Sequence, residues 1–243
     1  MFLKRVRALK ITGNSAEYID DPVAMEGPVS IYVNNELITV QVATLSDLKE
    51  LGAGYVISEG ISDKITSSEE EENSVYVYAE ITNFSNKITE SSGGTGFIRS
   101  VKKVSSEIKI NSADIINATK EIISDTWKET GGVHCSVLFR NSDVICKMSD
   151  VGRHNTLDKI IGFSELNNIN RSECYVGCTG RQPAGMVFKC ANSGLPVIIS
   201  KAASTQNGIK TADDSGITLI CFARGDRYTI YSHPQRIMGI DFP

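Results

Sequence analysis

Short apolar runs and helix-like segments alternate along residues 174–222, and this alternation restricts the fold more than any other feature of the chain. Pro183 begins the first helical segment and Gly194 follows its end, which is the usual asymmetry of a helix. The predicted strands are 174–178, 195–200 and 217–222, and the predicted helices are 183–192 and 205–215. The order strand, helix, strand, helix, strand predicts an α/β fold with neighbouring parallel strands and right-handed crossovers.

A hairpin is predicted before this region. Residues 136–139 and 144–148 are apolar runs of strand length around an Asn/Ser/Asp cluster at 141–143. After the hairpin, Asn155 is predicted to cap a helix that has Leu157 and Ile160 at helical spacing. The segment between strand and helix is therefore a corner of the fold.

The N-terminal part has a different pattern. Strands are predicted at 29–33 and 37–42 around an Asn-Asn turn, and a further strand at 75–78. A helix is expected from Ser46 as its cap to about Gly60. Glu69 to Glu72 is interpreted as a solvated acidic loop. We divide the chain into a smaller α+β part, residues 1–105, which contains a Ser/Gly-rich loop at 89–96, and a C-terminal α/β domain, residues 106–243.

Composition excludes several classes of function. The 243 residues carry a net charge of -4 with a pI of about 5.5, so nonspecific nucleic-acid binding is not expected. We also expect no membrane span and no secretory signal. The six cysteines lie mostly in apolar, strand-like segments, which is typical of buried free thiols in a reducing cytoplasm.

Cationic residues follow three predicted parallel strands. Gly180-Arg181 comes after the first, Lys201 after the second, and Arg224 to Arg227 after the third. The carboxyl ends of parallel strands share one edge, where ligands bind. The N-termini of the two helices point the same way and add positive partial charge. This edge is predicted to hold a pyrophosphate-bearing ligand; the alternative is a set of ordinary solvated loop ends.

Four further polar residues gather at the corner after the hairpin: His134, Asp150, Arg153 and His154. We predict that they form a second cluster beside the cationic edge and face a ligand. An Asp–His contact there would raise the pKa of the histidine. The alternative is a purely structural turn and cap.

Six short blocks stand out along the chain. They are TGGVH at 130–134, DVGRHNTLDK at 150–159, PVAMEGP at 22–28, SEGI at 58–61, TGR at 179–181 and FARGDR at 222–227. Together they resemble the motifs of the FdhD family of formate dehydrogenase accessory sulfurtransferases. These blocks occur in the family's order and cover nearly the whole chain.

The resemblance implies a cytoplasmic accessory protein of formate dehydrogenase that binds the molybdopterin guanine dinucleotide cofactor, with GDP as a fragment ligand. It implies a three-layer C-terminal domain similar to cytidine deaminase, a cysteine desulfurase as a partner, and a homodimer. The implied cofactor-binding segment is Phe222, Ala223, Arg224, Gly225, Asp226 and Arg227.

One departure from the family concerns sulfur. Family members that transfer sulfur carry it on a CxxC motif in a mobile loop, and here Ser92 and Thr95 occupy those two positions. A hydroxyl cannot form a persulfide, so both positions are expected to be inert. Three alternatives stay open: the protein binds the cofactor without passing sulfur, another cysteine carries it, or the loop aligns differently. We favour the first.

Two other classes of function differ in how well they fit the sequence. A zinc-dependent nucleobase deaminase needs an H-x-E and a P-C-x-x-C motif, and neither is present, so no metal is expected. A chaperone that binds a guanine nucleotide or a molybdopterin nucleotide, and catalyses no reaction, is consistent with the absence of a CxxC motif.

Overall fold

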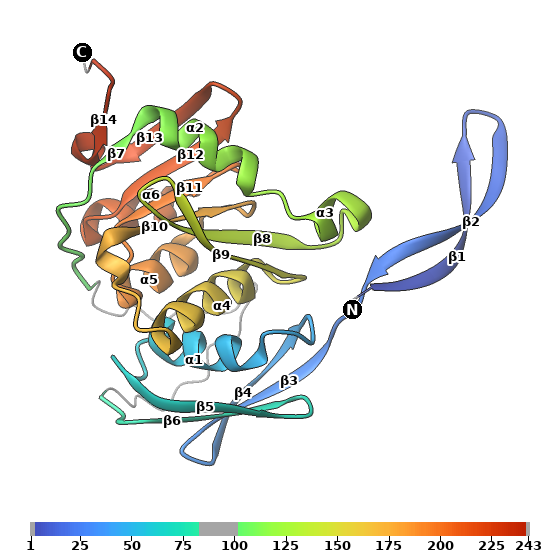
Figure 1. The fold of residues 1–243 in the computed structure, drawn as a ribbon, viewed down its shortest axis with the longest axis horizontal. Coiled ribbons are helices and arrows are strands. Elements are labelled where there is room, and N and C mark those ends of the chain that lie inside the picture. Colours follow the sequence, from blue (N-terminus) through green and yellow to red (C-terminus); the bar gives the residue numbers. More distant parts are fainter. Residues whose placement is uncertain (1–2, 83–101, 242–243) are drawn as a thin grey trace.

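The computed structural model describes residues 3–82 and 102–241. Its fold is mixed α/β, as the sequence predicts. A six-stranded sheet in the order β13-β12-β11-β10-β8-β9 forms the centre of the molecule (Figure 1). Its strands are β8 (His134–Arg140), β9 (Asp143–Asp150), β10 (Cys174–Cys178), β11 (Val197–Ser200), β12 (Thr218–Arg224) and β13 (Arg227–Ser232).

The predicted parallel unit is present. Strands β10, β11 and β12 are parallel neighbours, while β8 and β13 pair with β10 and β12 in the antiparallel sense. The crossover helices are α5 (Ala184–Ser193) and α6 (Gln206–Ser215). Gly194 ends α5 in the left-handed conformation, with φ of 77°, as its position predicts.

Both faces of the central sheet are covered. Helix α2 (Ser112–Glu121) packs on one face, where Ile115 and Val137 belong to one apolar cluster. Helix α4 (Arg153–Leu166), α5 and α6 cover the other face, where Leu157 and Leu138 belong to a second cluster. Val137 and Leu138 are adjacent in β8 and point to opposite faces of the sheet. Because both faces are buried, consecutive residues of this strand are apolar.

A second, four-stranded sheet with the order β4-β3-β6-β5 lies beyond α1 (Figure 1). Its elements are β3 (Gly27–Val33), β4 (Glu36–Ala43), α1 (Leu48–Ser58), β5 (Ile65–Glu71) and β6 (Ser74–Ala79). Alternating residues such as Ile31 and Val75 face α1, and their cluster continues into α4 and α5. One hydrophobic core therefore extends across the predicted boundary at residue 105.

Helices α1 and α4 approach each other at two glycines. A Cβ placed on Gly54 would lie 1.7 Å from Asp158 O, and one on Gly162 would lie 1.9 Å from Glu50 O. Backbone thus contacts backbone across this interface, which no larger side chain permits. The close contact joins the N-terminal layers to the central sheet.

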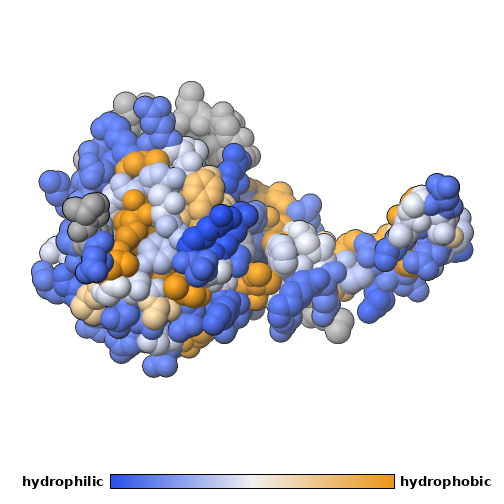
Figure 2. Space-filling view, turned by 90° about the horizontal axis from the view of Figure 1, so that it is seen from above, coloured by the Kyte–Doolittle hydropathy of each residue, from blue (hydrophilic) through white to orange (hydrophobic). Residues whose placement is uncertain are grey.

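A long hairpin was not indicated by the sequence pattern. Strands β1 (Leu3–Thr12) and β2 (Ser15–Ala24) form an antiparallel arm that stands clear of the body (Figures 1 and 2). Its apolar side chains, such as Leu9 and Tyr18, are exposed. An isolated two-stranded ribbon is only marginally stable in water.

The remaining elements are short. They are α3 (Asp125–Thr130), the two-residue parallel pair β7 (Ile110–Asn111) and β14 (Ile237–Met238), and the 3-10 turns η1 (Arg171–Glu173) and η2 (Pro234–Arg236).

Three local predictions were wrong. Asp47, with φ of 50°, precedes α1 and takes the cap position instead of Ser46. Helix α4 begins at Arg153 after Gly152, so Asn155 lies inside the helix. The acidic run is not a loop: Glu69 to Glu71 complete β5, an edge strand whose exposed charges discourage pairing with another chain.

Candidate functional site

A cavity of about 530 Å³ lies at the sheet edge where the parallel strands end. Its polar lining comes from His134 at the start of β8, Thr179 after β10, Lys201 after β11 and Arg224 at the end of β12. Trp127 of α3 contributes an apolar wall. Three consecutive strand ends therefore converge on one space, as the strand order predicts.

Two cations of the cavity are linked through the backbone. Lys201 donates its Nζ to Thr119 O at 3.0 Å, and Arg224 donates Nε to Lys201 O at 3.0 Å. Burial, and then the charge of Arg224, lower the pKa of Lys201. No contact to another described residue occupies the terminal nitrogens of Arg224, so they are available to a ligand.

The other predicted cations lie outside the cavity lining. Arg181 is exposed, and its charge contributes, after burial, to a lowered pKa of Arg153. Gly180 lies against Arg153, since an added Cβ would be 2.9 Å from Arg153 Cβ. Pro183 and Thr205 cap α5 and α6 at the same sheet edge, but neither lines the cavity in the described part of the chain.

The predicted segment 222–227 forms the β12–β13 turn. Gly225 (φ 58°) and Asp226 are its central residues, and Arg227 pairs across from Arg224. Phe222 is exposed with a positive φ of 54°, an uncommon conformation for an aromatic residue, and Ala223 is buried. Arg224 is the member of this segment that lines the cavity.

The predicted Asp–His contact is wrong. Asp150 is fully buried and accepts hydrogen bonds from Lys159 Nζ at 2.7 Å, Thr44 N at 3.0 Å and Gly152 N at 2.8 Å. Asn155 Nδ2 donates to the same carboxylate at 2.9 Å. Asp150 thus joins the end of β4 to the start of α4, and its side chain faces the interior.

Both histidines of the predicted cluster have lowered pKa values, opposite to the expected direction. Burial and the charge of Arg153 lower the pKa of His134, and the weaker effect of Asp150 opposes them. Burial, then Lys189 and Arg153, lower the pKa of His154 to about 4. Both imidazoles are therefore neutral at physiological pH.

A second buried polar network involves Asp158, near the end of the motif DVGRHNTLDK. Lys189 of α5 donates to Asp158 Oδ1 at 2.9 Å and to Ser58 Oγ at 3.0 Å, and it pairs with Glu59 at 2.7 Å. This network connects α1, α4 and α5. Much of DVGRHNTLDK therefore holds the fold together instead of facing a ligand.

Thr179 and Trp127 line the cavity but are not among the site residues that the sequence predicts. The single tryptophan of the chain was a usable signal, because tryptophan is enriched at binding interfaces.

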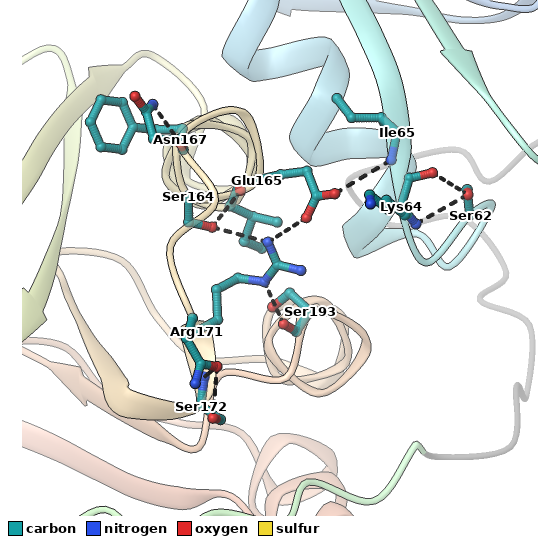
Figure 3. Close-up of polar contacts among 12 residues, drawn as sticks. Ser62, Lys64, Ile65, Ser164, Glu165, Asn167, Arg171, Ser172 and Ser193 are labelled. Atoms are coloured by element: carbon teal, nitrogen blue, oxygen red, sulfur yellow. Dashed lines mark hydrogen bonds and ion pairs between the residues drawn. The ribbon is translucent and has the colours of Figure 1, made fainter.

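A second cavity, of about 430 Å³, lies where α4 and α5 end. Figure 3 shows its centre, where Arg171 donates to Glu165 Oε2 at 2.8 Å and to Ser193 O at 2.6 Å. Glu165 Oε1 in turn accepts the amide of Ile65 at 3.4 Å. The guanidinium of Arg171 is thus occupied by contacts within the protein. This cavity is therefore a weaker candidate for a ligand site than the cavity lined by Lys201 and Arg224.

The cysteines do not offer a reactive thiol. All six are buried and free. Burial raises the pKa of Cys135 to about 11, and raises those of Cys146, Cys178 and Cys221 to about 12. It also raises the pKa values of Cys174 and Cys190. Ser92 and Thr95 lie outside the described residues.

Within residues 3–82 and 102–241, no group of three or more His, Cys, Asp or Glu side chains is placed to hold a metal ion. Over the same residues, no helix has the length and apolar character needed to cross a membrane.

Comparisons with known proteins agree over most of the chain. The model of the FdhD/NarQ family matches residues 24–238. Protein FdhD of Methanocaldococcus jannaschii is 32% identical over 95% of this chain and 96% of its own length. The sulfur carrier protein FdhD of Methanothermobacter thermautotrophicus is 31% identical over 90% of this chain and 93% of its own.

A solved structure is also similar. The crystal structure of a candidate formate dehydrogenase accessory protein from Desulfotalea psychrophila superposes with a TM-score of 0.83 and 26% identity. The match covers 98% of this chain and 100% of the other, so the whole architecture is shared.

Proposed function

Because the chain belongs to the FdhD/NarQ family, we propose that it is a formate dehydrogenase accessory protein whose cavity binds molybdopterin guanine dinucleotide. The convergence of Lys201, Arg224, Thr179 and His134 on one cavity carries this proposal. The relatives' names and the solved structure support the general role.

The residues of the cavity fit a nucleoside diphosphate. Lys201 and Arg224 supply two positive charges for phosphate oxygens, and the exposed ring of Trp127 offers a surface on which a planar base can stack. Nearby, Arg153 Nε is buried without a hydrogen-bond partner in the described residues. A volume of about 530 Å³ suits a ligand of this size. The cofactor supplies molybdenum chemistry to the client enzyme, and this chain holds its phosphates.

We further propose that the protein binds the cofactor without carrying sulfur. The six cysteines are buried and have raised pKa values, so the thiolate that attacks a sulfur donor is scarce. Sulfuration by a cysteine desulfurase, as in family members with CxxC, is the competing function.

Finer features belong to the same proposal. The strand order β9-β8-β10-β11-β12, with helices on both faces, supports a cytidine-deaminase-like arrangement for residues 106–243. The reducing environment that six free thiols need supports a cytoplasmic location. A homodimer is proposed from the family resemblance alone.

Cofactor binding is tested by purifying the protein from cells that make molybdopterin nucleotides and analysing released ligands by mass spectrometry. Calorimetry with GDP tests the fragment directly, with ADP as the base-specificity control. The proposal predicts that GDP binds; absence of both GDP binding and a co-purified pterin would refute it.

Sulfur transfer is tested by incubating the protein with a cysteine desulfurase and cysteine. The wild type should gain little persulfide, while the S92C/T95C variant, which restores both thiols, should gain it at the new cysteines. A stoichiometric persulfide mapped to a native cysteine of the wild type would establish the competing function.

A further inference from the structure

The hydroxyl of Thr179 lies among three hydrogen-bonding groups at the edge of the cavity. Cys135 N donates to Thr179 Oγ1 at 3.0 Å, and His134 Nδ1 lies 3.1 Å from the same oxygen. The third group, Cys135 O, is 3.5 Å away. Thr179 thus contacts the backbone N–H and C=O of Cys135 and the imidazole ring of His134.

Two acceptors compete for the single hydroxyl proton of Thr179. Cys135 O lies 3.5 Å from Oγ1, which is long for an O–H···O hydrogen bond, and it also accepts the amide of Thr179 at 3.0 Å. His134 Nδ1 lies at 3.1 Å, so the geometry favours the imidazole nitrogen as the acceptor of the hydroxyl proton. A neutral imidazole that accepts at Nδ1 carries its own proton on Nε2.

The surroundings keep His134 neutral. Burial lowers the pKa of His134 most, and the charge of Arg153 on α4 lowers it further. Asp150 on β9 would favour the charged ring, but its carboxylate is engaged by Lys159 at 2.7 Å. His154 on α4 is also near, and Lys201 and Arg224 line the same cavity.

We infer that Thr179 is a positioning residue that holds His134 as the Nε2–H tautomer, so that His134 presents a hydrogen-bond donor to the cavity. Nε2 has no partner among the described residues, and His134 lines the cavity. The Nε2–H group of His134 can then donate a hydrogen bond to an acceptor oxygen of the ligand, such as a phosphate or carbonyl oxygen. Because the ring is neutral, it adds no third positive charge to those of Lys201 and Arg224. The ligand-binding role of His134 rests on the proposed function of the cavity. The tautomer itself rests only on the contacts among Thr179, His134 and Cys135.

The tautomer is measured directly by long-range 1H–15N NMR of the ligand-free protein labelled with 15N-histidine. The chain has three histidines, and the signals of His134 are those lost in H134Q. We expect Nδ1 unprotonated and Nε2 protonated at pH 7. An Nδ1–H tautomer or a charged ring at that pH would overturn the inference.

The role of Thr179 is tested by the pair T179V and T179S. Thr179→Val keeps the shape but removes the hydroxyl, so the His134 signals should move toward a tautomer mixture, whereas T179S should retain the wild-type pattern. Wild-type signals in a folded T179V would show that Thr179 does not set the tautomer. If T179V fails to fold, T179A replaces it, and the wild-type spectrum already decides the proton's position.

Ligand binding provides the second readout, through the fluorescence of the single tryptophan, Trp127, which lines the cavity. GDP affinity should fall about three- to tenfold in T179V and stay within about twofold in T179S. Equal affinity in all three proteins would contradict the ligand-facing role. If the wild type itself bound no GDP, the proposed function would fail, while the NMR result would stand independently.

Discussion

Asp150 and Lys159 form an ion pair that is closed to solvent on both sides, with Nζ 2.7 Å from Oδ2. The carboxylate also receives the amide of Thr44, which lies 106 positions earlier in the chain. The pair therefore fixes the end of β4 against the second turn of α4. Because α4 carries Arg153 beside the cavity, this joint also positions part of the candidate site.

Removal of only one partner of the Asp150–Lys159 ion pair should lower the free energy of unfolding strongly. K159M leaves Asp150 as a buried, uncompensated charge, and we expect a loss of about 3–5 kcal/mol in the free energy of unfolding. The matched control is K210M: its ion pair with Asp214 is exposed and screened by solvent, so its loss should leave the free energy of unfolding nearly unchanged. Urea denaturation measures both, and similar losses in the two variants would contradict the prediction.

The glycine contact between α1 and α4 gives a second stability prediction. A Cβ at Gly54 would lie 1.7 Å from Asp158 O, so G54A must separate two helices or abolish folding. We expect a loss of about 3 kcal/mol or more. The control is G185A in α5, where the nearest atom, His154 Nε2, is 3.7 Å from the added Cβ. That change should be neutral or stabilising by about 0.5–1 kcal/mol; thermal melts compare the two.

Removal of one cation should weaken nucleotide binding. R224A is expected to lose a charge-assisted contact worth about 1.5–3 kcal/mol, which corresponds to roughly a ten- to hundredfold rise in the Kd for GDP. R227A is the matched control, because Arg227 lies across the same hairpin but outside the cavity lining. Calorimetry of the two variants tests the placement, which would be wrong if Arg224→Ala bound GDP as tightly as the wild type.

His154 should make stability depend on pH. Its pKa is about 4 in the folded protein against 6.5 for the free side chain, so the unfolded chain takes up a proton first as the pH falls. The stabilisation it provides is complete above about pH 6.5 and is lost progressively toward pH 4. H154Q cannot titrate, so the difference in Tm between wild type and H154Q should shrink across this window.

That difference isolates His154. Asp158, whose pKa burial raises to about 6, titrates in both proteins and cancels to first order. H233Q is the control, since His233 lies near the C-terminus beside Asp213 and away from α4. A Tm difference that stayed constant from pH 7 to 4.5 would show that His154 is not shielded from protonation.

Local signals in the sequence predicted the elements well. The Asn34-Asn35 turn has both residues in the left-handed region and closes β3–β4, as Asn-Asn turns favour. The alternation after residue 174 predicted three parallel strands, and the residues after them meet at one cavity. These predictions succeed because turns, helix ends and strand periodicity depend on residues close together in the chain.

The arm was the main element that local signals did not reveal. Strands β1 and β2 expose Leu9 and Tyr18 among charged residues, so no buried face produces a strict apolar alternation. The edge strand β5 was missed for the same reason, since Glu69 to Glu71 need only backbone pairing to β6. Without burial, the usual pattern of a strand is absent.

By itself, the sequence determined the α/β class, the family and the edge of the sheet where the cavity lies, because these follow from short-range patterns and motif order. The tertiary structure alone decided what each polar side chain of the motif does. Asp150 and His134 are directly paired on adjacent strands, yet one contacts Lys159 in the core and the other contacts Thr179 at the cavity. Thr44, which also binds Asp150, and Thr179, which binds His134, lie 106 and 45 positions away from these residues. Such distant partners, and the burial of the side chains, set the contacts and the histidine pKa values, and neither is encoded in local spacing.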